Sequence, residues 1–445
     1  MIVKTLYYVK KNWVTFNPSQ LLVFVFITAI LLGAMLLKLP YSTTEPISWI
    51  DALFTSTSAM TVTGLTVVDT GVVYTTFGEC VIMVLIQVGG LGIMSFAVLI
   101  FMMLGKKIGM KERMVIQQAL NQSSLGGMIN LVKHLFIFSL TIELIAMIFL
   151  SIRWVPEYGF YKGLYYSLFH SVSAFNNAGF GLWSNNLMDY VGDPIVNIII
   201  SGLFIFGGIG FTVLMDVRYK KSFRKLSLHS KIMLVGTFII NISAMFIIFC
   251  LEYSNSFAGY SIIEKLWASF FQAVTTRTAG FNTVDLTLLS EPSILLMIIL
   301  MFIGAGSGST GGGIKLTTFI VIVLSVITFL KGKEEIVIAR RSINEKLIIK
   351  ALAITMISLL FVVSSIFILS ITENAPLLYI FFEVISAFGT VGLTLGLTYS
   401  LTFIGKLVII IVMLIGKIGP LTLVYSIAKQ EKEKVRYPSE EILTG

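Results

Sequence analysis

The sequence predicts an all-α polytopic membrane protein made of four fused repeats, with eight transmembrane spans in total. The first observation is composition, because 56% of the 445 residues are apolar and 12% are charged, whereas about a quarter are charged in soluble domains. The second is length, since apolar segments such as residues 21–37 and 351–371 approach the roughly 20 helical residues that a bilayer requires. The third is a short polar motif that occurs four times between such segments.

Each repeat is expected to contain, in order, a span, a short half-crossing helix with a polar loop, and a second span. The predicted repeats cover residues 1–110, 111–226, 227–345 and 346–445. First spans are predicted at residues 20–39, 128–152, 231–251 and 347–371, and half-crossing helices at 47–60, 163–175, 262–275 and 377–388. Second spans are predicted at residues 75–104, 195–215, 294–330 and 404–428, the last followed by a C-terminal tail.

The number of crossings fixes the relative orientation of the repeats. Two full crossings return the chain to the same side of the membrane, so all four repeats share one orientation. Inverted repeats would indicate an alternating-access carrier with its site at the repeat interface. Parallel repeats with re-entrant loops instead favour a pseudo-fourfold ring around a central pore.

The distribution of charge predicts the side on which the termini lie. Most of the 32 basic residues are near the N-terminus or in residues 106–113, 218–231, 331–350 and 429–436. The other polar connections carry acids, such as Asp69 and Asp285. This asymmetry is typical of a multi-pass protein of the cell membrane with both termini in the cytoplasm. The net charge of +9 is then a topology signal, and no nucleic-acid partner is expected.

The four polar motifs share a phenylalanine ten residues before a glycine. They occupy residues 54–64, 169–179, 270–280 and 382–392. Backbone that leaves helical geometry at membrane depth is tolerated only where it is buried in protein or lines a water-filled cavity. Glycine reaches positive φ without a Cβ clash, which allows successive carbonyl groups to face one axis. These loops are therefore the candidate functional site.

Four such loops predict rings of backbone carbonyl oxygens, which can replace the hydration shell of an alkali cation. No ring of Asp or Glu precedes the glycines, which argues against a carboxylate filter for divalent ions. The alternative is four short loops between packed helices, with glycines for close approach. The candidate carbonyl donors are Thr61, Val62, Thr63, Gly64, Asn176, Asn177, Ala178, Gly179, Arg277, Thr278, Ala279, Gly280, Gly389, Thr390, Val391 and Gly392.

The chain resembles the Trk/Ktr/HKT superfamily of potassium transporters over essentially its whole length, and most closely the KtrB-type membrane subunits of the Ktr branch. The motifs that carry the resemblance are TVTGL at 61–65, NNAGF at 176–180, TRTAGF at 276–281, GTVGL at 389–393 and GAGSGSTGGGIK at 304–315. Glycine in all four loops is the pattern of the potassium-selective members, whereas serine in the first is associated with sodium preference. The resemblance therefore implies that Gly64 favours K+, with some passage of Na+.

A glycine-rich segment interrupts the second span of the third repeat. It consists of Gly304, Ala305, Gly306, Ser307, Gly308, Ser309, Thr310, Gly311, Gly312 and Gly313. It contains a G-x-G-x-x-G match, which we reject as a dinucleotide fingerprint because no strand precedes it. Glycines cost about 1 kcal/mol each relative to alanine in a helix, so a broken helix with a mobile loop is expected. The resemblance implies an intramembrane gating loop, and the alternative is a glycine-rich helix crossing.

Lys417 replaces a glycine in the GGxG pattern that ends the second spans of repeats 1 and 2. A cation in mid-membrane normally faces a bundle interior or a cavity. Superfamily members carry a basic residue, often arginine, near this position beneath the filter, so we expect Lys417 to add a repulsive barrier to K+. The alternative is a structural role in which its ammonium group binds loop carbonyls.

Two further residues carry expectations. Arg277 is expected to support the third loop by pairing with an acid such as Asp285. Glu143 is the one intramembrane acid that the sequence offers for a rival function, a secondary carrier that couples K+ to Na+ or H+. The sequence contains no nucleophile, acid–base or P-loop motif that supports an enzyme.

The resemblance also implies partners. Members of the Ktr branch work as homodimers and bind a cytoplasmic ring of nucleotide-binding RCK domains (KtrA-like). No covalently bound cofactor is expected, K+ occupies the pore, and nucleotide acts only through the partner. The basic segments 106–113, 218–231 and 331–350, with the tail 430–445, are the expected docking surface. Topology signalling and contact with anionic membrane lipids would explain the same charges.

Overall fold

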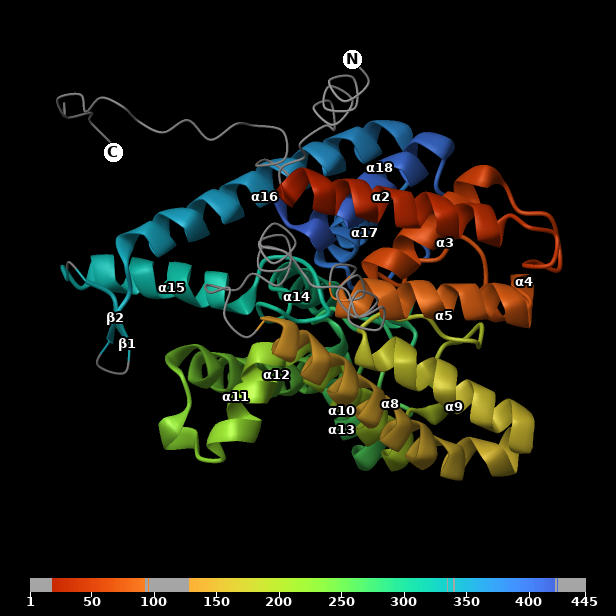
Figure 1. Ribbon diagram of the computed structural model, residues 1–445, viewed down its shortest axis with the longest axis horizontal. Helices are drawn as coiled ribbons and strands as arrows, with labels where there is room; N and C mark the ends of the chain where they lie inside the picture. Colours follow the sequence, from red (N-terminus) through yellow and green to blue (C-terminus); the bar gives the residue numbers. More distant parts are fainter. Residues whose placement is uncertain are drawn as a thin grey trace, which may run out of the picture.

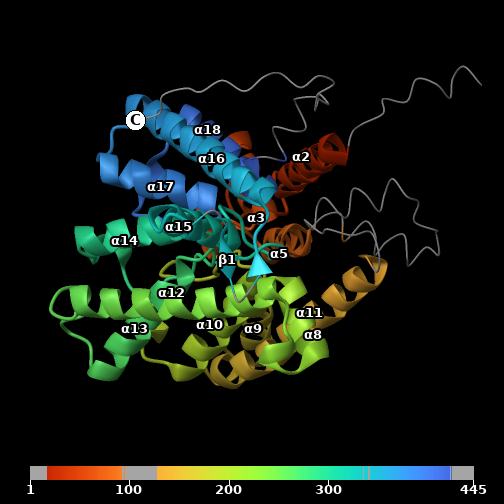
Figure 2. The same ribbon diagram turned by 90° about the vertical axis from the view of Figure 1, so that its left-hand side faces the viewer.

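The computed structural model describes residues 18–92, 95, 128–333, 335–338, 341–420 and 422. Several expectations lie outside these residues: the basic N-terminus, the segment 106–113, the boundary between the first two repeats and the tail 430–445. The described chain is mostly helical (Figure 1). Helices from its two ends, α2 and α18 with α16, lie on the same side of the molecule in both views (Figures 1 and 2).

Four long helices correspond to the predicted first spans. They are α2 (Pro18–Leu37), α8 (Met128–Tyr158), α12 (Leu228–Glu252) and α16 (Glu345–Thr372). Each contains a stretch long and apolar enough to cross a membrane. Their exposed side chains include Ile148, Phe246 and Phe367. Burial of such large apolar side chains in lipid is favourable, so the exposed faces of these helices suit a bilayer.

Four short helices occupy the predicted half-crossing segments: α3 (Trp49–Thr61), α9 (Phe160–Phe175), α13 (Ile262–Thr275) and α17 (Leu377–Gly389). At 1.5 Å per residue, none is long enough to cross a hydrocarbon core of about 30 Å. Caps favour their starts, since the Ser48 hydroxyl accepts from the Asp51 amide and Ser261 forms a capping box with Glu264. Each short helix leads directly into one of the polar loops.

Each repeat has a second helix within the described residues, although parts of the predicted second spans 75–104 and 404–428 lie outside them. These second helices are α5 (Thr76–Leu91), α10 (Pro194–Ile209), α14 (Glu291–Phe302) and α18 (Phe403–Ile418). The second span expected at residues 195–215 is broken, because α10 and α11 (Phe211–Lys220) meet at 95°. The physical cause is Gly210, whose φ of 106° is incompatible with a regular helix. The described helices therefore include four candidate spans, or five if α10 and α11 are counted together.

In the third repeat the expected break is present. Helix α14 ends at Phe302 and α15 (Leu316–Leu330) begins after the glycine-rich segment. The smaller elements are α4 (Thr70–Val73), η1 (Met188–Tyr190), η2 (Phe223–Lys225), η3 (Leu286–Leu288), η4 (Leu397–Ser400) and a two-stranded hairpin of β1 (Val337–Ile338) and β2 (Arg341–Ser342).

The helices of successive repeats pack in a closed cycle. The second helix of each repeat contacts the short helix of the next, in the pairs α5–α9, α10–α13 and α14–α17, and α18 of the last repeat contacts α3 of the first. An ion pair reinforces the closing contact, since Lys406 Nζ lies 2.7 Å from the Asp51 carboxylate. The first and last repeats are therefore neighbours, although they are most distant in sequence.

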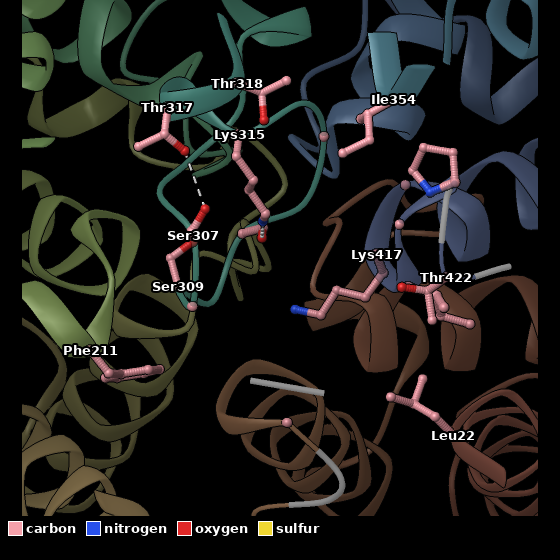
Figure 3. Close-up of a pocket in the computed structure, with 18 of the residues that line it drawn as sticks. Leu22, Phe211, Ser307, Ser309, Lys315, Thr317, Thr318, Ile354, Lys417 and Thr422 are labelled. Atoms are coloured by element: carbon pink, nitrogen blue, oxygen red, sulfur yellow. Dashed lines mark hydrogen bonds between the residues drawn. The ribbon is translucent and has the colours of Figure 1, made fainter. Parts of the chain in front are cut away.

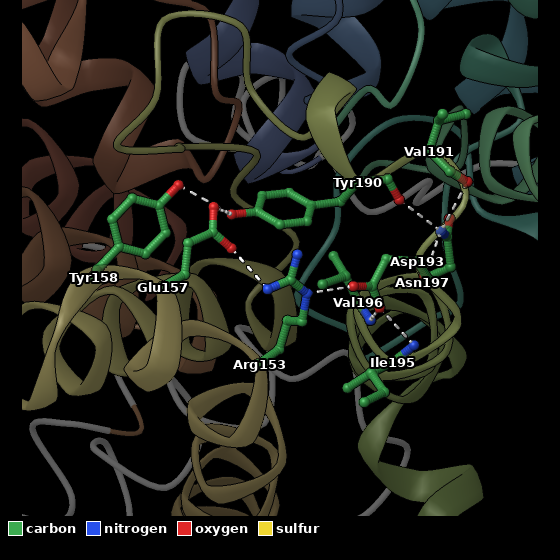
Figure 4. A network of polar contacts seen from close by, with 9 residues as sticks. All are labelled: Arg153, Glu157, Tyr158, Tyr190, Val191, Asp193, Ile195, Val196 and Asn197. Carbon is green, nitrogen blue, oxygen red and sulfur yellow. Dashed lines mark hydrogen bonds and ion pairs between the residues drawn. The ribbon is translucent and has the colours of Figure 1, made fainter.

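A polar network joins α8 to the start of α10 within the second repeat (Figure 4). Arg153 lies 2.6 Å from the Asp193 carboxylate and 2.8 Å from that of Glu157. Asp193 also caps α10 by accepting from the Ile195 and Val196 amides. One arginine thus holds the ends of two helices at a fixed separation.

Candidate ion pathway

The four predicted loops share one backbone conformation. The residue two positions before each glycine has positive φ: Val62 (52°), Asn177 (58°), Thr278 (71°) and Thr390 (50°). The glycines follow with φ of 91°, 69°, 80° and 90°. Positive φ is uncommon for residues other than glycine and unusual for a β-branched one. Its recurrence in unrelated side chains shows that the surrounding fold imposes this turn.

The four glycines lie against one another in a cycle. A Cβ atom added to Gly64 would lie 2.4 Å from the carbonyl oxygen of Ala178, which precedes the glycine of the second loop. The same holds for Gly179 and the Ala279 oxygen (3.0 Å), for Gly280 and the Val391 oxygen (2.3 Å), and for Gly392 and the Thr63 oxygen (2.1 Å). Each loop therefore contacts the next, the fourth contacts the first, and only glycine fits at the contact.

Buried hydroxyl groups hold the loops from behind. The Ser58 and Ser386 hydroxyls accept from the amides of Gly64 and Gly392, each at 3.1 Å. In the second and third loops, Ser173 and Thr275 donate instead to the carbonyls of Phe180 (2.8 Å) and Phe281 (2.6 Å). Our sequence reasoning missed these residues. The signal was a serine or threonine five or six residues before every glycine.

A cavity of about 220 Å³ opens on one side of the loops. All four glycines border it, together with the acids Asp69 and Asp285 and the amide side chains of Asn185, Asn186 and Asn282. It is thus a polar vestibule with two carboxyl groups and no lysine or arginine in its lining. Such a lining favours cations, and the glycines form its floor.

A larger cavity of about 460 Å³ is bordered by other parts of the chain (Figure 3). Residues of the glycine-rich segment border it, including Ser307, Ser309 and Gly311, and so do Lys315 and Lys417. None of the four loop glycines is among its lining residues. The two cavities therefore differ in charge, since the first carries carboxyl groups and the second carries lysines.

The glycine-rich segment is bound to the loops. Its ends meet in a bridge between Ile303 and Ile314. Between them, the Thr310 hydroxyl donates to Asn177 Oδ1 (3.0 Å) and the Gly312 amide donates to the Thr390 hydroxyl (2.8 Å). Predicted gate residues thus contact two of the residues that carry positive φ in the loops.

The same segment also contacts the break in the second repeat. The Gly306 amide donates to the Gly208 carbonyl (2.8 Å), and the Phe211 amide donates to the Gly308 carbonyl (3.0 Å). The bend at Gly210 therefore supplies hydrogen-bond partners for the non-helical backbone of the glycine-rich segment. Backbone groups at membrane depth need such partners, because lipid offers none.

Two lysines bind the carbonyls of the glycine-rich segment. Lys417 Nζ donates to the Thr310 carbonyl, and Lys315 Nζ donates to the Gly311 carbonyl at 2.7 Å. Both ammonium groups reach the larger cavity (Figure 3). Lys417 thus makes the contact with a loop carbonyl that its structural role would require. Because its ammonium group also reaches the larger cavity, its position is equally compatible with an electrostatic barrier to K+. Lys315 was not among the predicted gate residues, although it lies two residues after the glycine-rich segment.

The predicted pairing of Arg277 with Asp285 is wrong. The Asp285 carboxylate accepts from the amide and hydroxyl of Thr287 (2.9 and 2.7 Å) and borders the vestibule. Arg277 is buried in a separate small cavity with Thr237 and Asn241, and its Nε atom has no partner. The turn at Thr278 places the arginine on the side of the loop away from the vestibule.

Two fully or almost fully buried acids flank the loops. Glu143 in α8 is 3% exposed, and its carboxylate accepts from the side chains of Ser139, Gln87 and Asn176. Glu383 in α17 is 0% exposed and accepts from Thr398 and, at 2.7 Å, from Thr394. The sequence offered Glu143 as the one intramembrane acid. Glu383 is a second buried acid beside the loops. Glu383 lies in the repeated motif itself, nine residues before Gly392.

Comparison with known proteins places this geometry in a family. A family model described as cation transport protein (TrkH) matches residues 15–436. The Ktr system potassium uptake protein B of Bacillus subtilis is 61% identical over 98% of this chain and 98% of its own length. The protein of the same name from Vibrio alginolyticus is 45% identical over 96% and 95%, respectively. The potassium/sodium uptake protein NtpJ of Enterococcus hirae is 39% identical over 96% and 97%.

A solved structure supports the fold independently. The potassium transporter TrkH from Vibrio parahaemolyticus superposes with a TM-score of 0.74, covering 94% of this chain and 86% of its own, at 20% identity. These relatives are transport proteins and not enzymes. Because the family model spans nearly the whole chain and full-length relatives exceed 30% identity, the chain belongs to the TrkH family of cation transport proteins.

Proposed function

We propose that this protein is the potassium-translocating membrane subunit of a Ktr-type uptake system, and that it also passes some Na+. The relatives named above, which are potassium or potassium/sodium uptake proteins, support the substrate. The observation that carries the proposal is the closed cycle of glycine–carbonyl contacts among the four loops. It brings together four equivalent stretches of backbone and leaves no room for side chains between them.

In this proposal the four repeats form a pseudo-fourfold ring of eight crossings around one pore, with both termini in the cytoplasm. The residues before the glycines differ among the loops, being Thr63, Ala178, Ala279 and Val391. No side chain can therefore form a uniform ring, whereas backbone carbonyls can. The carbonyls of the sixteen predicted filter residues, from Thr61 to Gly392, would replace the hydration shell of K+. The acidic vestibule would raise the local concentration of cations.

The glycine-rich segment serves as the gate between the filter and the larger cavity. Its hydrogen bonds to Asn177 and Thr390 support this role, because they fasten it directly to two filter loops. The ammonium groups of Lys315 and Lys417 would repel K+ on the inner side. Displacement of the segment would release both lysines from the carbonyls that hold them.

Replacement of Lys417 by alanine is expected to increase K+ flux. The change removes a positive charge beside the ion path, and a barrier reduced by about 1.4 kcal/mol would raise the rate about tenfold. The measurement is K+ flux against K+ concentration in proteoliposomes. Lys406→Ala is the control, since that lysine pairs with Asp51 away from both cavities. A Lys417→Ala protein with wild-type flux and concentration dependence would leave Lys417 with the structural role alone.

The partner assignments follow from the Ktr relatives and rest on them. We propose a homodimer with one pore per protomer, regulated by a cytoplasmic ring of RCK domains that binds the nucleotide. The described parts of the docking surface are residues 218–231, 331–333, 335–338 and 341–350. The end of helix α11, the 3-10 turn η2 and the hairpin β1–β2 lie in these segments. Anionic membrane lipids are the competing ligand for their basic residues.

The decisive experiment is ion flux in proteoliposomes that contain the purified protein, with K+, Na+ or choline under an imposed voltage. We expect K+ flux driven by voltage alone, weaker Na+ flux and no choline flux. Strict dependence of K+ flux on a Na+ or H+ gradient would instead establish the secondary carrier, with Glu143 and Glu383 as the candidate relay groups. Absence of K+ flux in folded protein would refute both functions.

A further inference from the structure

Glu143 combines burial with an unusual set of partners. Its side chain is 3% exposed within α8, and the four ion pairs found among the described residues do not include it. One carboxylate oxygen accepts from the Ser139 hydroxyl (2.7 Å), from the Gln87 amide (3.1 Å) and from the Asn176 amide (3.3 Å). A buried carboxyl group is costly unless it is well hydrogen-bonded, and here every donor is neutral.

Asn176 connects this carboxyl group to the second filter loop. It is the C-cap of α9, and its side-chain amide also donates to Gln87 Oε1 (2.7 Å) and to the Val172 carbonyl (2.9 Å). A Cβ atom added to Gly90 would lie 2.1 Å from Asn176 Oδ1, so α5 packs directly on this side chain. The next residue, Asn177, begins the turn with positive φ and binds the gate through Thr310. Helices α5, α8 and α9 therefore converge on the base of one filter loop.

The second loop requires this support more than the first and fourth do. In those loops the glycine amide donates to a serine hydroxyl of the preceding helix, Ser58 or Ser386. The corresponding Ser173 donates its hydroxyl to the Phe180 carbonyl, so this group holds the loop beyond the glycine. Asn176 and its partners hold the segment before the glycine instead.

We propose that Glu143 is a positioning residue, which acts through Asn176 to hold the second filter loop in the geometry that discriminates K+ from Na+. It neither contacts the ion nor carries a proton across the membrane. The inference rests on the proposed function and adds a determinant of selectivity outside the loops. Without an acceptor at position 143, the Gln87 and Asn176 amides lose a buried partner, and such donors move until they find another.

The test compares three substitutions of buried carboxyl groups. Glu143→Leu removes the acceptors at similar volume, whereas Glu143→Gln keeps a carbonyl oxygen for Ser139 and Asn176. Glu79→Leu is the matched control, because Glu79 is also buried (8% exposed), accepts from Tyr165 (2.7 Å) and has no hydrogen bond to a filter loop among those found. The measurement is the K+/Na+ permeability ratio, taken from reversal potentials of the purified protein in lipid bilayers.

We expect Glu143→Leu to lower the K+/Na+ ratio about tenfold, which corresponds to about 1.4 kcal/mol. Glu143→Gln should stay within about twofold of wild type, since it retains the acceptor, and Glu79→Leu should leave the ratio unchanged. If Glu143→Leu does not fold, Gln87→Leu should lower the ratio less but in the same direction. Because coupled residues are non-additive, Glu143→Leu should have little further effect in an Asn176→Leu background.

Three outcomes would overturn the inference. They are a wild-type ratio in folded Glu143→Leu or Gln87→Leu, an equal loss in Glu143→Gln, which would assign the effect to charge, and additive losses in the double mutant. A wild-type protein that conducts no K+ would count against the proposed function, and not against the positioning role alone. The two failures are therefore distinguishable in the same set of recordings.

Discussion

Gly64→Ser is expected to reduce the K+/Na+ permeability ratio about tenfold, the effect of a change of about 1.4 kcal/mol. Gly64 has a φ of 91°, and an added Cβ atom would lie 2.4 Å from the Ala178 carbonyl oxygen. Such contact is closer than van der Waals packing permits, so one of the two loops must move. Movement of a loop withdraws its carbonyl oxygens from the ring, and Na+ gains relative to K+ because the fit to the larger ion is lost.

The control for this substitution is Gly159→Ser. Gly159 also has positive φ (82°), but no atom lies within 4 Å of an added Cβ. It therefore reproduces the backbone strain, of order 1–3 kcal/mol, without the contact between loops. For both variants, the K+/Na+ permeability ratio is measured from reversal potentials under K+/Na+ gradients. Unchanged discrimination in folded Gly64→Ser would refute the assignment of these loops as a filter.

Deletion of residues 306–311 is expected to raise K+ flux by at least about tenfold, because a barrier lower by about 1.4 kcal/mol has that effect. The deleted residues carry the Thr310 hydroxyl that binds Asn177 and the carbonyls that hold Lys315 and Lys417. The deletion is structurally feasible. A Cβ atom added to Gly304 would lie 2.2 Å from the Gly312 carbonyl oxygen, so the ends of the segment already touch.

The same experiment separates gating from packing. Thr310→Val serves as the partial variant, since it removes the bond to Asn177 and leaves the backbone in place. It should raise flux less than the deletion does. Flux is measured by K+ uptake into proteoliposomes at equal protein content, with folding checked by size-exclusion chromatography. If the folded deletion variant shows wild-type flux or none, the segment is a packing element and the gate assignment fails.

The second spans show where sequence reasoning was limited. Hydropathy identified residues 195–215 as one span, because most side chains there are apolar. The 95° bend at Gly210 depends on backbone φ, to which hydropathy is insensitive. The third repeat was predicted correctly because Gly304–Gly313 contains so many glycines that a regular helix was untenable. The shorter GGIG motif at 207–210 gave a weaker signal, and it was read as part of one span.

The sequence also failed to predict which side chains contact each other across the fold. Arg277 and Asp285 are eight residues apart, and their proximity in sequence suggested a pair. The turn at Thr278 directs them to different cavities. Conversely, the partners of Glu143 come from α5, α8 and α9, which no local spacing connects. Sequence distance is a poor guide to contact when helices from different repeats converge on one loop.

The sequence by itself determined that this is a helical membrane protein with four copies of one polar loop, because apolar length and a ten-residue spacing are properties of the chain alone. It also located the break after Phe302 and the unusual intramembrane lysine, Lys417. Only the tertiary structure decided that the four glycines touch in a closed cycle, that Thr310 and Gly312 bind two of the loops, and that Gln87, Ser139 and Asn176 meet at Glu143. The reason is physical: the glycine–carbonyl contacts and the hydrogen-bond networks form between segments about a hundred residues apart, and their geometry exists only after the repeats have packed together.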